Sequence, residues 1–179
     1  MRQYITIMKI SSTLRTCGKI IVTVLMAAPA LAQAAPKLAG THGDWSVYTR
    51  GSGAERVCYV LSEAQAKSPT SVKHGEIYFM VSSWKNGAAT EQPSFLAGYP
   101  LKTTRAPKAK VGSTALSMFA ADNEAFVSEN ADERRLVSKM RAGSTMTVSA
   151  VSKRGTQTRY TFSLKGVTAA LRQSKSACS

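Results

Sequence analysis

The stretch GSTMTVSAVSKRGTQTRYTFSLKGVTAAL, residues 143–171, decides the fold that we predict for this chain. Apolar and polar residues alternate on both sides of a Gly-containing turn at residues 153–155. This period of two is typical of a β-hairpin with one buried face. Residues 166–172 then predict one or two turns of helix. The residues expected to point inward are Met146, Val148, Ala150, Tyr160, Phe162 and Leu164.

Short apolar runs separated by turn signals fill the chain before this hairpin. The run GEIYFMVSSW at 75–84 is the most hydrophobic, and we expect it to form a central strand. Residues 35–40 predict a short leader and residues 63–74 a loop. Residues 102–110 contain four basic side chains and Pro107, which predicts an exposed loop or an edge strand. The other expected strands are residues 45–49, 56–62, 95–99, 115–120 and 125–128.

Residues 130–141 form the one segment before the hairpin with a clear helical pattern. Asn130 is a suitable N-cap, acidic Asp132 and Glu133 suit the positive end of a helix, and Gly143 suits its stop. The apolar stripe of this helix is Leu136, Val137 and Met140. We therefore predict an all-β protein, an antiparallel β-sandwich with one short helix between strands and a short C-terminal helix.

The first 34 residues have the pattern of a secretory signal peptide. Four basic and no acidic side chains accompany an apolar run at 20–30, and the motif AQA at 32–34 is a suitable cleavage site. A membrane anchor is the alternative, but this run is shorter than the ~20 residues that a bilayer requires. We therefore expect a signal peptide over 1–34, with Met8 as an alternative start, and one β-sandwich domain over 35–179.

The chain that follows the predicted signal peptide is strongly basic. The sequence has 24 Lys and Arg residues and 10 Asp and Glu residues, and removing four basic residues with the signal leaves a net charge of +10. This excess favours anionic partners such as envelope or host-surface glycans and lipids, whereas export argues against a specific nucleic acid. A solvated basic surface without a ligand is the alternative. The candidate anion-binding residues are Lys102, Arg105, Lys108, Lys110, Lys153, Arg154 and Arg159.

Two cysteines, Cys58 and Cys178, lie beyond the predicted signal peptide. In an exported domain such a pair is best explained as one disulfide. A reactive thiol pair is the alternative, but the sequence has no CxxC motif and no His beside either cysteine. In the chain-entropy model, a cross-link over this loop stabilises the fold by about 4–5 kcal/mol.

Residues suited to catalysis or metal binding are few. His42 and His74 are the only histidines and neither has a ligand-spaced partner, so we expect no metal site and no cofactor. A Ser or Cys nucleophile needs an adjacent His and an orienting acid. Asp44 near His42 is the only start of such a site, and we therefore expect no catalytic residues and no enzymatic activity. A small periplasmic hydrolase that uses His42 and Asp44 is kept as an alternative.

Several short motifs occur in a fixed order from residue 43 onward. They are GDW at 43–45, CY at 58–59, GEIYFMVSSW at 75–84, AGYP at 97–100, MRAGS at 140–144, RGTQT at 154–158, YTFSLKGVTAAL at 160–171 and AC at 177–178. This ordered set resembles the invasion-associated locus B family of exported proteobacterial proteins. The resemblance implies a compact β-sandwich of the periplasm or cell surface, and it offers no catalytic residues.

The charge and the resemblance together lead to one expected function. We expect a non-enzymatic protein that is periplasmic, or secreted and associated with the outer surface, and that binds anionic partners through a basic face. After signal cleavage it is not expected to be an integral membrane protein. The family name also implies host-cell invasion or adhesion, which is kept as an alternative function.

Overall fold

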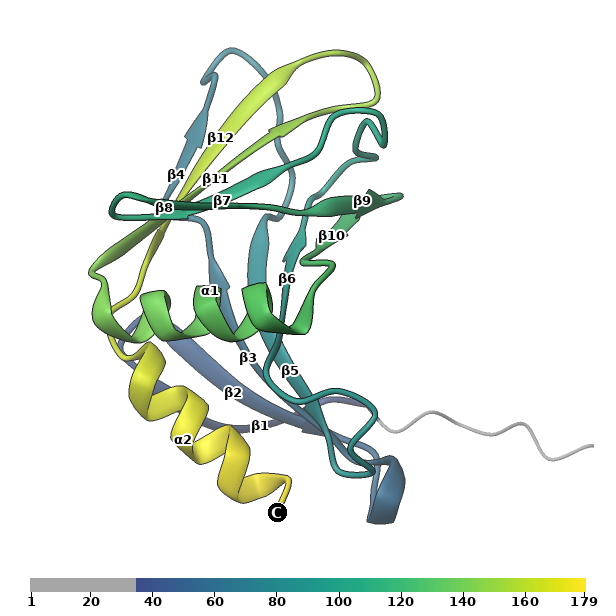
Figure 1. The fold of residues 1–179 in the computed structure, drawn as a ribbon, viewed down its shortest axis with the longest axis vertical. Helices are drawn as coiled ribbons and strands as arrows, with labels where there is room; N and C mark the ends of the chain where they lie inside the picture. The colour runs from purple at the N-terminus through teal and green to yellow at the C-terminus, as the bar shows by residue number, and fades with distance from the viewer. Residues whose placement is uncertain (1–34) are drawn as a thin grey trace, which may run out of the picture. The chain divides into compact units, whose positions relative to one another are not determined.

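The computed structural model describes residues 35–179, which form two antiparallel β-sheets and two α-helices (Figure 1). The predicted antiparallel β-sandwich is therefore confirmed, whereas the predicted signal peptide at 1–34 lies outside the described residues. The seven-stranded sheet consists, from edge to edge, of β1 (Lys37–His42), β2 (Trp45–Arg50), β3 (Val57–Glu63), β5 (Tyr78–Trp84), β6 (Gln92–Leu96), β10 (Glu124–Phe126) and β9 (Phe119–Ala121). The five-stranded sheet consists of β4 (Ala66–Ser68), β12 (Gln157–Ser163), β11 (Thr145–Val151), β7 (Lys108–Val111) and β8 (Thr114–Ser117).

The β11–β12 hairpin has the register that its alternation predicts. Val148 pairs with Tyr160, and the six residues expected to point inward are at most 5 % exposed. Their side chains meet strands β5 and β6 at the centre of the other sheet. The Phe162 ring lies 5.8 Å from that of Phe79, and the Tyr160 ring lies 5.5 Å from that of Phe95. These aromatic contacts join the two sheets, and burial of such large rings is the main stabilising term in a core.

Three short strands differ from the sequence prediction. Strand β1 replaces the predicted leader, β4 lies inside the predicted loop at 63–74, and β7 lies between β11 and β8 instead of in an exposed segment. Strands β1 and β4 are sheet edges with mostly exposed residues, so no apolar periodicity marks them. In β7, exposed Lys108 and Lys110 alternate with buried Ala109 and Val111, but a small Ala makes this pattern weak.

The single strand predicted at 115–120 is two strands that belong to different sheets. Strand β8 ends at Ser117 and β9 begins at Phe119, on either side of Met118, which is 2 % exposed. The backbone N–H of Met118 donates to the carbonyl oxygen of Pro107 at 2.8 Å and fixes this corner. The segment therefore carries the chain from the five-stranded sheet to the seven-stranded sheet.

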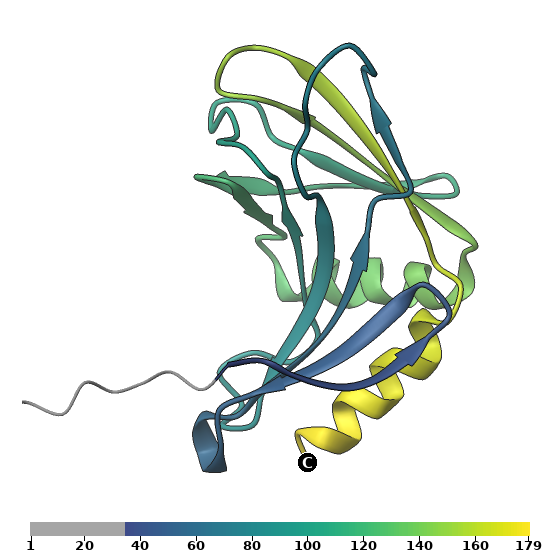
Figure 2. The same ribbon diagram turned by 180° about the vertical axis from the view of Figure 1, so that it is seen from behind.

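The two helices pack between and beside the sheets (Figures 1 and 2). Helix α1 (Asn130–Ala142) contacts β6 of one sheet and β7 and β8 of the other, and its predicted apolar stripe is buried. Helix α2 (Val167–Ala177) lies against β1, β2 and β3 and is longer than predicted. The predicted N-cap is wrong, because Asn130 is already helical and Glu129 occupies the cap position without a side-chain hydrogen bond. Neither helix of the described chain is long and apolar enough to cross a membrane.

Candidate anion-binding site

Three of the predicted anion-binding cations lie on the outward face of the five-stranded sheet. The register of β7, β11 and β12 aligns Lys108, Ser149 and Arg159 in one row. In the next outward row along the same strands, Thr147 lies between Lys110 and Thr161. All of these side chains are exposed or half-buried. We call this surface the basic sheet face, and it consists of Lys108, Lys110, Thr147, Ser149, Arg159 and Thr161.

The other four predicted cations lie in two loops that meet at one end of this face. A β-bridge joins Leu101 to Ser152, and the N–H of Lys102 donates to the carbonyl oxygen of Val151 at 2.8 Å. The two basic segments, far apart in the sequence, are therefore neighbours in space. We call them the basic loops, and their cations are Lys102, Arg105, Lys153 and Arg154.

A groove of about 260 Å³ lies on the basic sheet face. Lys108 and Arg159 both line it, and the hydroxyls of Ser68 and Ser149 line it as well. Cationic side chains and hydroxyl donors are the groups that proteins use to bind phosphate, sulfate and carboxylate oxygens. The groove is therefore chemically suited to an anion.

Acidic residues are absent from the segments that form most of the five-stranded sheet. Residues 99–121 and 134–179, which contain four of the five strands of this sheet, carry no Asp or Glu. Within residues 35–179 the salt bridges are Lys67 to Glu63 and Arg141 to Glu91, so none of the seven predicted cations is neutralised by a carboxylate. An unneutralised group of like charges produces a positive potential that attracts anions over several ångströms.

A polar cavity lies at the same end of the sandwich as the basic loops. This end cavity measures about 430 Å³ and lies between the β4–β5 loop, Tyr99 and the β11–β12 hairpin. Lys73 and Arg154 supply its two cations. Its lining is completed by Val72, His74, Tyr99, Ser152, Thr156 and Thr158.

A chain of hydrogen bonds runs through the buried side of the end cavity. The Tyr99 hydroxyl lies 2.7 Å from the hydroxyls of both Thr158 and Tyr160, and the Tyr160 hydroxyl lies 2.9 Å from Nδ1 of His74. Nε2 of His74 donates to the carbonyl oxygen of Pro69 at 2.8 Å. Burial raises the pKa of the Tyr160 phenol, and its hydrogen bond with Tyr99 raises that pKa further. Tyr160 is therefore a neutral core residue, as the sequence favours, and not an exposed stacking platform.

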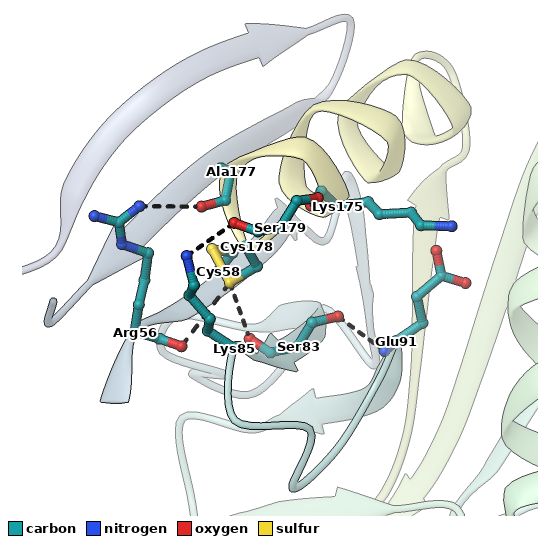
Figure 3. The surroundings of a disulfide bond; sticks show 9 residues. All are labelled: Arg56, Cys58, Ser83, Lys85, Glu91, Lys175, Ala177, Cys178 and Ser179. Carbon is teal, nitrogen blue, oxygen red and sulfur yellow. Dashed lines mark hydrogen bonds between the residues drawn. A yellow bond between two sulfur atoms is a disulfide. The ribbon is translucent and has the colours of Figure 1, made fainter. Parts of the chain in front are cut away.

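The predicted disulfide between Cys58 and Cys178 is present and joins β3 to the end of α2 (Figure 3). The two Cα atoms are 5.8 Å apart, and Cys58 is fully buried. Two cations flank the bond: Arg56 donates to the carbonyl oxygen of Ala177 at 3.2 Å, and Nζ of Lys85 donates to that of Ser179 at 2.9 Å. Cations at these carbonyl groups complement the negative end of α2. The disulfide region thus secures the helix to the seven-stranded sheet.

His42 is hydrogen-bonded to α2. His42 ends β1, and its Nε2 lies 2.6 Å from Oε1 of Gln173 in α2. The turn that follows His42 packs against Gly166, where an added Cβ would lie 2.0 Å from the His42 carbonyl oxygen. His42 is therefore held by tertiary packing and does not lie in a leader. Residues 35–179 contain no group of three or more His, Cys, Asp or Glu side chains arranged for a metal ion.

Sequence reasoning missed the hydroxyl groups and the buried histidine of this region. Thr147 and Ser149 separate the cations, and their outward positions follow from the alternation of β11. His74 and Lys73 were assigned to a featureless loop because the long-range contact with Tyr160 has no local signal. The alternation of β11, which identified the inward residues, also predicts that Thr147 and Ser149 point outward beside the cations.

The fold and the surface together define a disulfide-bonded β-sandwich with one basic outer face. Residues 45–175 match the family described as "Invasion associated locus B (IalB) protein". The chain belongs to this family, as its ordered motifs indicate. No curated protein and no solved structure gives a significant match to the chain.

Proposed function

We propose that this protein is exported and non-enzymatic, and that it binds anionic envelope or host-surface glycans or lipids through the basic sheet face. One observation carries the proposal: three neighbouring strands present cations and hydroxyls on one face that has no carboxylate. The predicted signal sequence, the disulfide and family membership support export. A periplasmic or outer-surface location follows from this proposal.

The spread of the cations over neighbouring strands suits a polyanion. Lys108 and Arg159 lie on strands separated by β11, and two interstrand spacings amount to about 10 Å. Lys108 and Lys110 lie two residues apart on one strand, about 7 Å. A surface or polymer with repeated negative groups can contact several of these cations at once.

A charge-reversal experiment tests this proposal. The double variant Lys108→Glu, Arg159→Glu changes the basic sheet face, and the matched control Lys37→Glu, Lys165→Glu makes the same change in net charge elsewhere. All four side chains are exposed. We expect the first variant to lose at least about tenfold in affinity for heparin and for lipopolysaccharide, and the control to lose much less. Binding by the wild type should also weaken with salt.

Two results would contradict the proposal. Equal losses in the two double variants would mean that net charge alone attracts the polyanion, without a defined face. Wild-type affinity no higher than that of a neutral protein of similar size would remove anionic partners altogether.

Host-cell invasion or adhesion is the second candidate function, and the description of the family is its support. It requires the protein to reach the outer surface, so protease cleavage on intact cells is its first test. Protection until the outer membrane is permeabilised would restrict the protein to the periplasm. The hydrolase alternative is tested by His42→Ala, which should leave any detected turnover unchanged.

A further inference from the structure

We propose that the end cavity is a separate site for a single tetrahedral oxyanion, a phosphate or sulfate group. This inference extends the proposed anion binding, but it concerns different residues and a different ligand. The basic sheet face presents cations from neighbouring strands, whereas the end cavity, about 430 Å³, is lined by Lys73 and Arg154 from two different loops. Inorganic phosphate and sulfate are the probes of this chemistry.

The donors that line the end cavity come from three separate segments. Lys73 lies in the loop between β4 and β5, Tyr99 follows β6, and Arg154 lies in the β11–β12 turn. No carboxylate lines the cavity, and neither Lys73 nor Arg154 forms a salt bridge with any residue of 35–179. Arg can bind two oxygens of one oxyanion at once, and Lys can bind another. Arg154 and Lys73 therefore supply charged donors for one tetrahedral anion.

A chain of five hydrogen bonds lies beneath the cavity. It runs from the carbonyl oxygen of Pro69 to that of Ala150 through the side chains of His74, Tyr160, Tyr99 and Thr158. His74, Tyr99 and Thr158 also line the cavity, so these hydrogen bonds fix the positions of three of its lining residues.

Titration of phosphate and sulfate at constant ionic strength tests the site. We expect saturable binding of both to the folded protein, an affinity about tenfold weaker in Arg154→Gln, and a change of less than about twofold in Lys153→Gln. Lys153 is the matched control, because it precedes Arg154 in the same turn, is exposed and does not line the cavity. No saturation in the wild type, or equal losses in the two variants, would overturn the proposal.

Vesicles carrying a phosphomonoester lipid distinguish the sources of the ligand. Release of these vesicles by inorganic phosphate assigns the cavity to a lipid headgroup, whereas phosphate binding without vesicle binding assigns it to a free anion.

The two proposals fail in different ways. Lys108→Glu, Arg159→Glu should lower polyanion affinity at least about tenfold and leave sulfate affinity within about twofold, because neither residue lines the end cavity. Arg154→Gln should lower sulfate affinity about tenfold and leave polyanion affinity within about twofold. Loss of both activities in each variant would show one continuous charged surface and would overturn the separate site.

Discussion

The two sheets have similar inner faces but opposite outer faces. The basic sheet face presents hydroxyls and cations, whereas the seven-stranded sheet presents rings and aliphatic side chains. Tyr48 and Tyr59 stack there at 5.3 Å, and Phe119, 49 % exposed, lies 5.7 Å from Phe126. We call this second surface the aromatic sheet face, and it consists of Tyr48, Tyr59, Leu61, Met80, Phe119 and Phe126.

The comparison of inner and outer faces distinguishes two groups of residues. Inward residues form the core, whereas outward residues are available for binding. Inward positions on both sheets must be apolar because they form one core. Outward positions carry no such requirement, and here they differ in charge as well as polarity. All ten acidic residues lie in the seven-stranded sheet, in the segments that flank its strands or in the first part of α1. Binding of anions and covalent stabilisation should therefore respond to different substitutions.

The largest expected effect is on the covalent link of the seven-stranded sheet. Replacing both Cys58 and Cys178 by Ser should lower the free energy of unfolding by about 2–5 kcal/mol. Without the bond, the unfolded chain is no longer closed into a loop across a sequence separation of 120 and gains conformational entropy. Chemical denaturation with and without reductant measures this change. Reductant should destabilise the wild type and leave the variant unaffected, and the folded variant should still bind heparin. Loss of binding in the folded variant would contradict the separation of the two sheets.

A smaller effect is expected where the two sheets are joined by polar contacts. Tyr99→Phe removes the hydroxyl that lies within 2.7 Å of Thr158 and Tyr160, and leaves the ring in place. Unfolding should become easier by about 1–3 kcal/mol, because buried hydrogen-bonding groups lose a partner. Thermal unfolding provides the measurement, with half-buried Tyr78→Phe as the control on the outward side of β5. Equal stability in the two variants would mean that the hydrogen bonds of the Tyr99 hydroxyl contribute nothing to joining the sheets.

The sharpest comparison places one carboxylate on each outer face. Ser149→Asp puts a negative charge between Lys108 and Arg159, whereas Ser82→Asp puts it in the row that contains Tyr48 and Tyr59. Both serines are half-buried and point outward. We expect heparin affinity to fall about tenfold in the first variant, a loss of ~1.4 kcal/mol in binding free energy. In the second variant the affinity should fall less than about twofold. Similar losses in both would refute a localised anion site.

The smallest effect concerns pH and the acidic residues near the seven-stranded sheet. Burial raises the pKa of Glu133, although the Gln92 side chain and Arg134 act in the opposite direction. The native state therefore holds its proton more tightly than the unfolded state, and this contribution to stability is lost as pH rises above the usual value of about 4.3. Glu133→Gln should be more stable than the wild type at neutral pH, by less than about 1.4 kcal/mol. The difference should vanish near pH 4 in thermal melts, and a constant difference would refute the titration.

The basic sheet face was the more predictable of the two from sequence. In β11 and β12, polar residues alternate cleanly with apolar ones, so register and inward face both follow from the pattern. Strand β5 is apolar on both faces, which correctly indicated a central strand but concealed which side meets the core. The aromatic sheet face was missed for that reason.

Pairings between distant segments were beyond the reach of sequence patterns. The cations at residues 102–110 and 153–159 were identified, but their adjacency depends on β7 pairing with β11, and β7 has too few large apolar residues to be recognised. His74 similarly gains its role from Tyr160, 86 residues away. Composition identified the charge, and tertiary structure concentrated it.

The link between Cys58 and Cys178 also has a consequence for the order of events during biosynthesis. A chain that emerges from its N-terminal end presents Cys58 first, and 120 positions separate the two cysteines. Strands β4 to β12 lie between the two cysteines in the sequence, so all of them must emerge before the bond can close. During that interval Cys58 is an unpaired thiol, and the burial that it has in the finished sheet is what would shield it from the wrong partner.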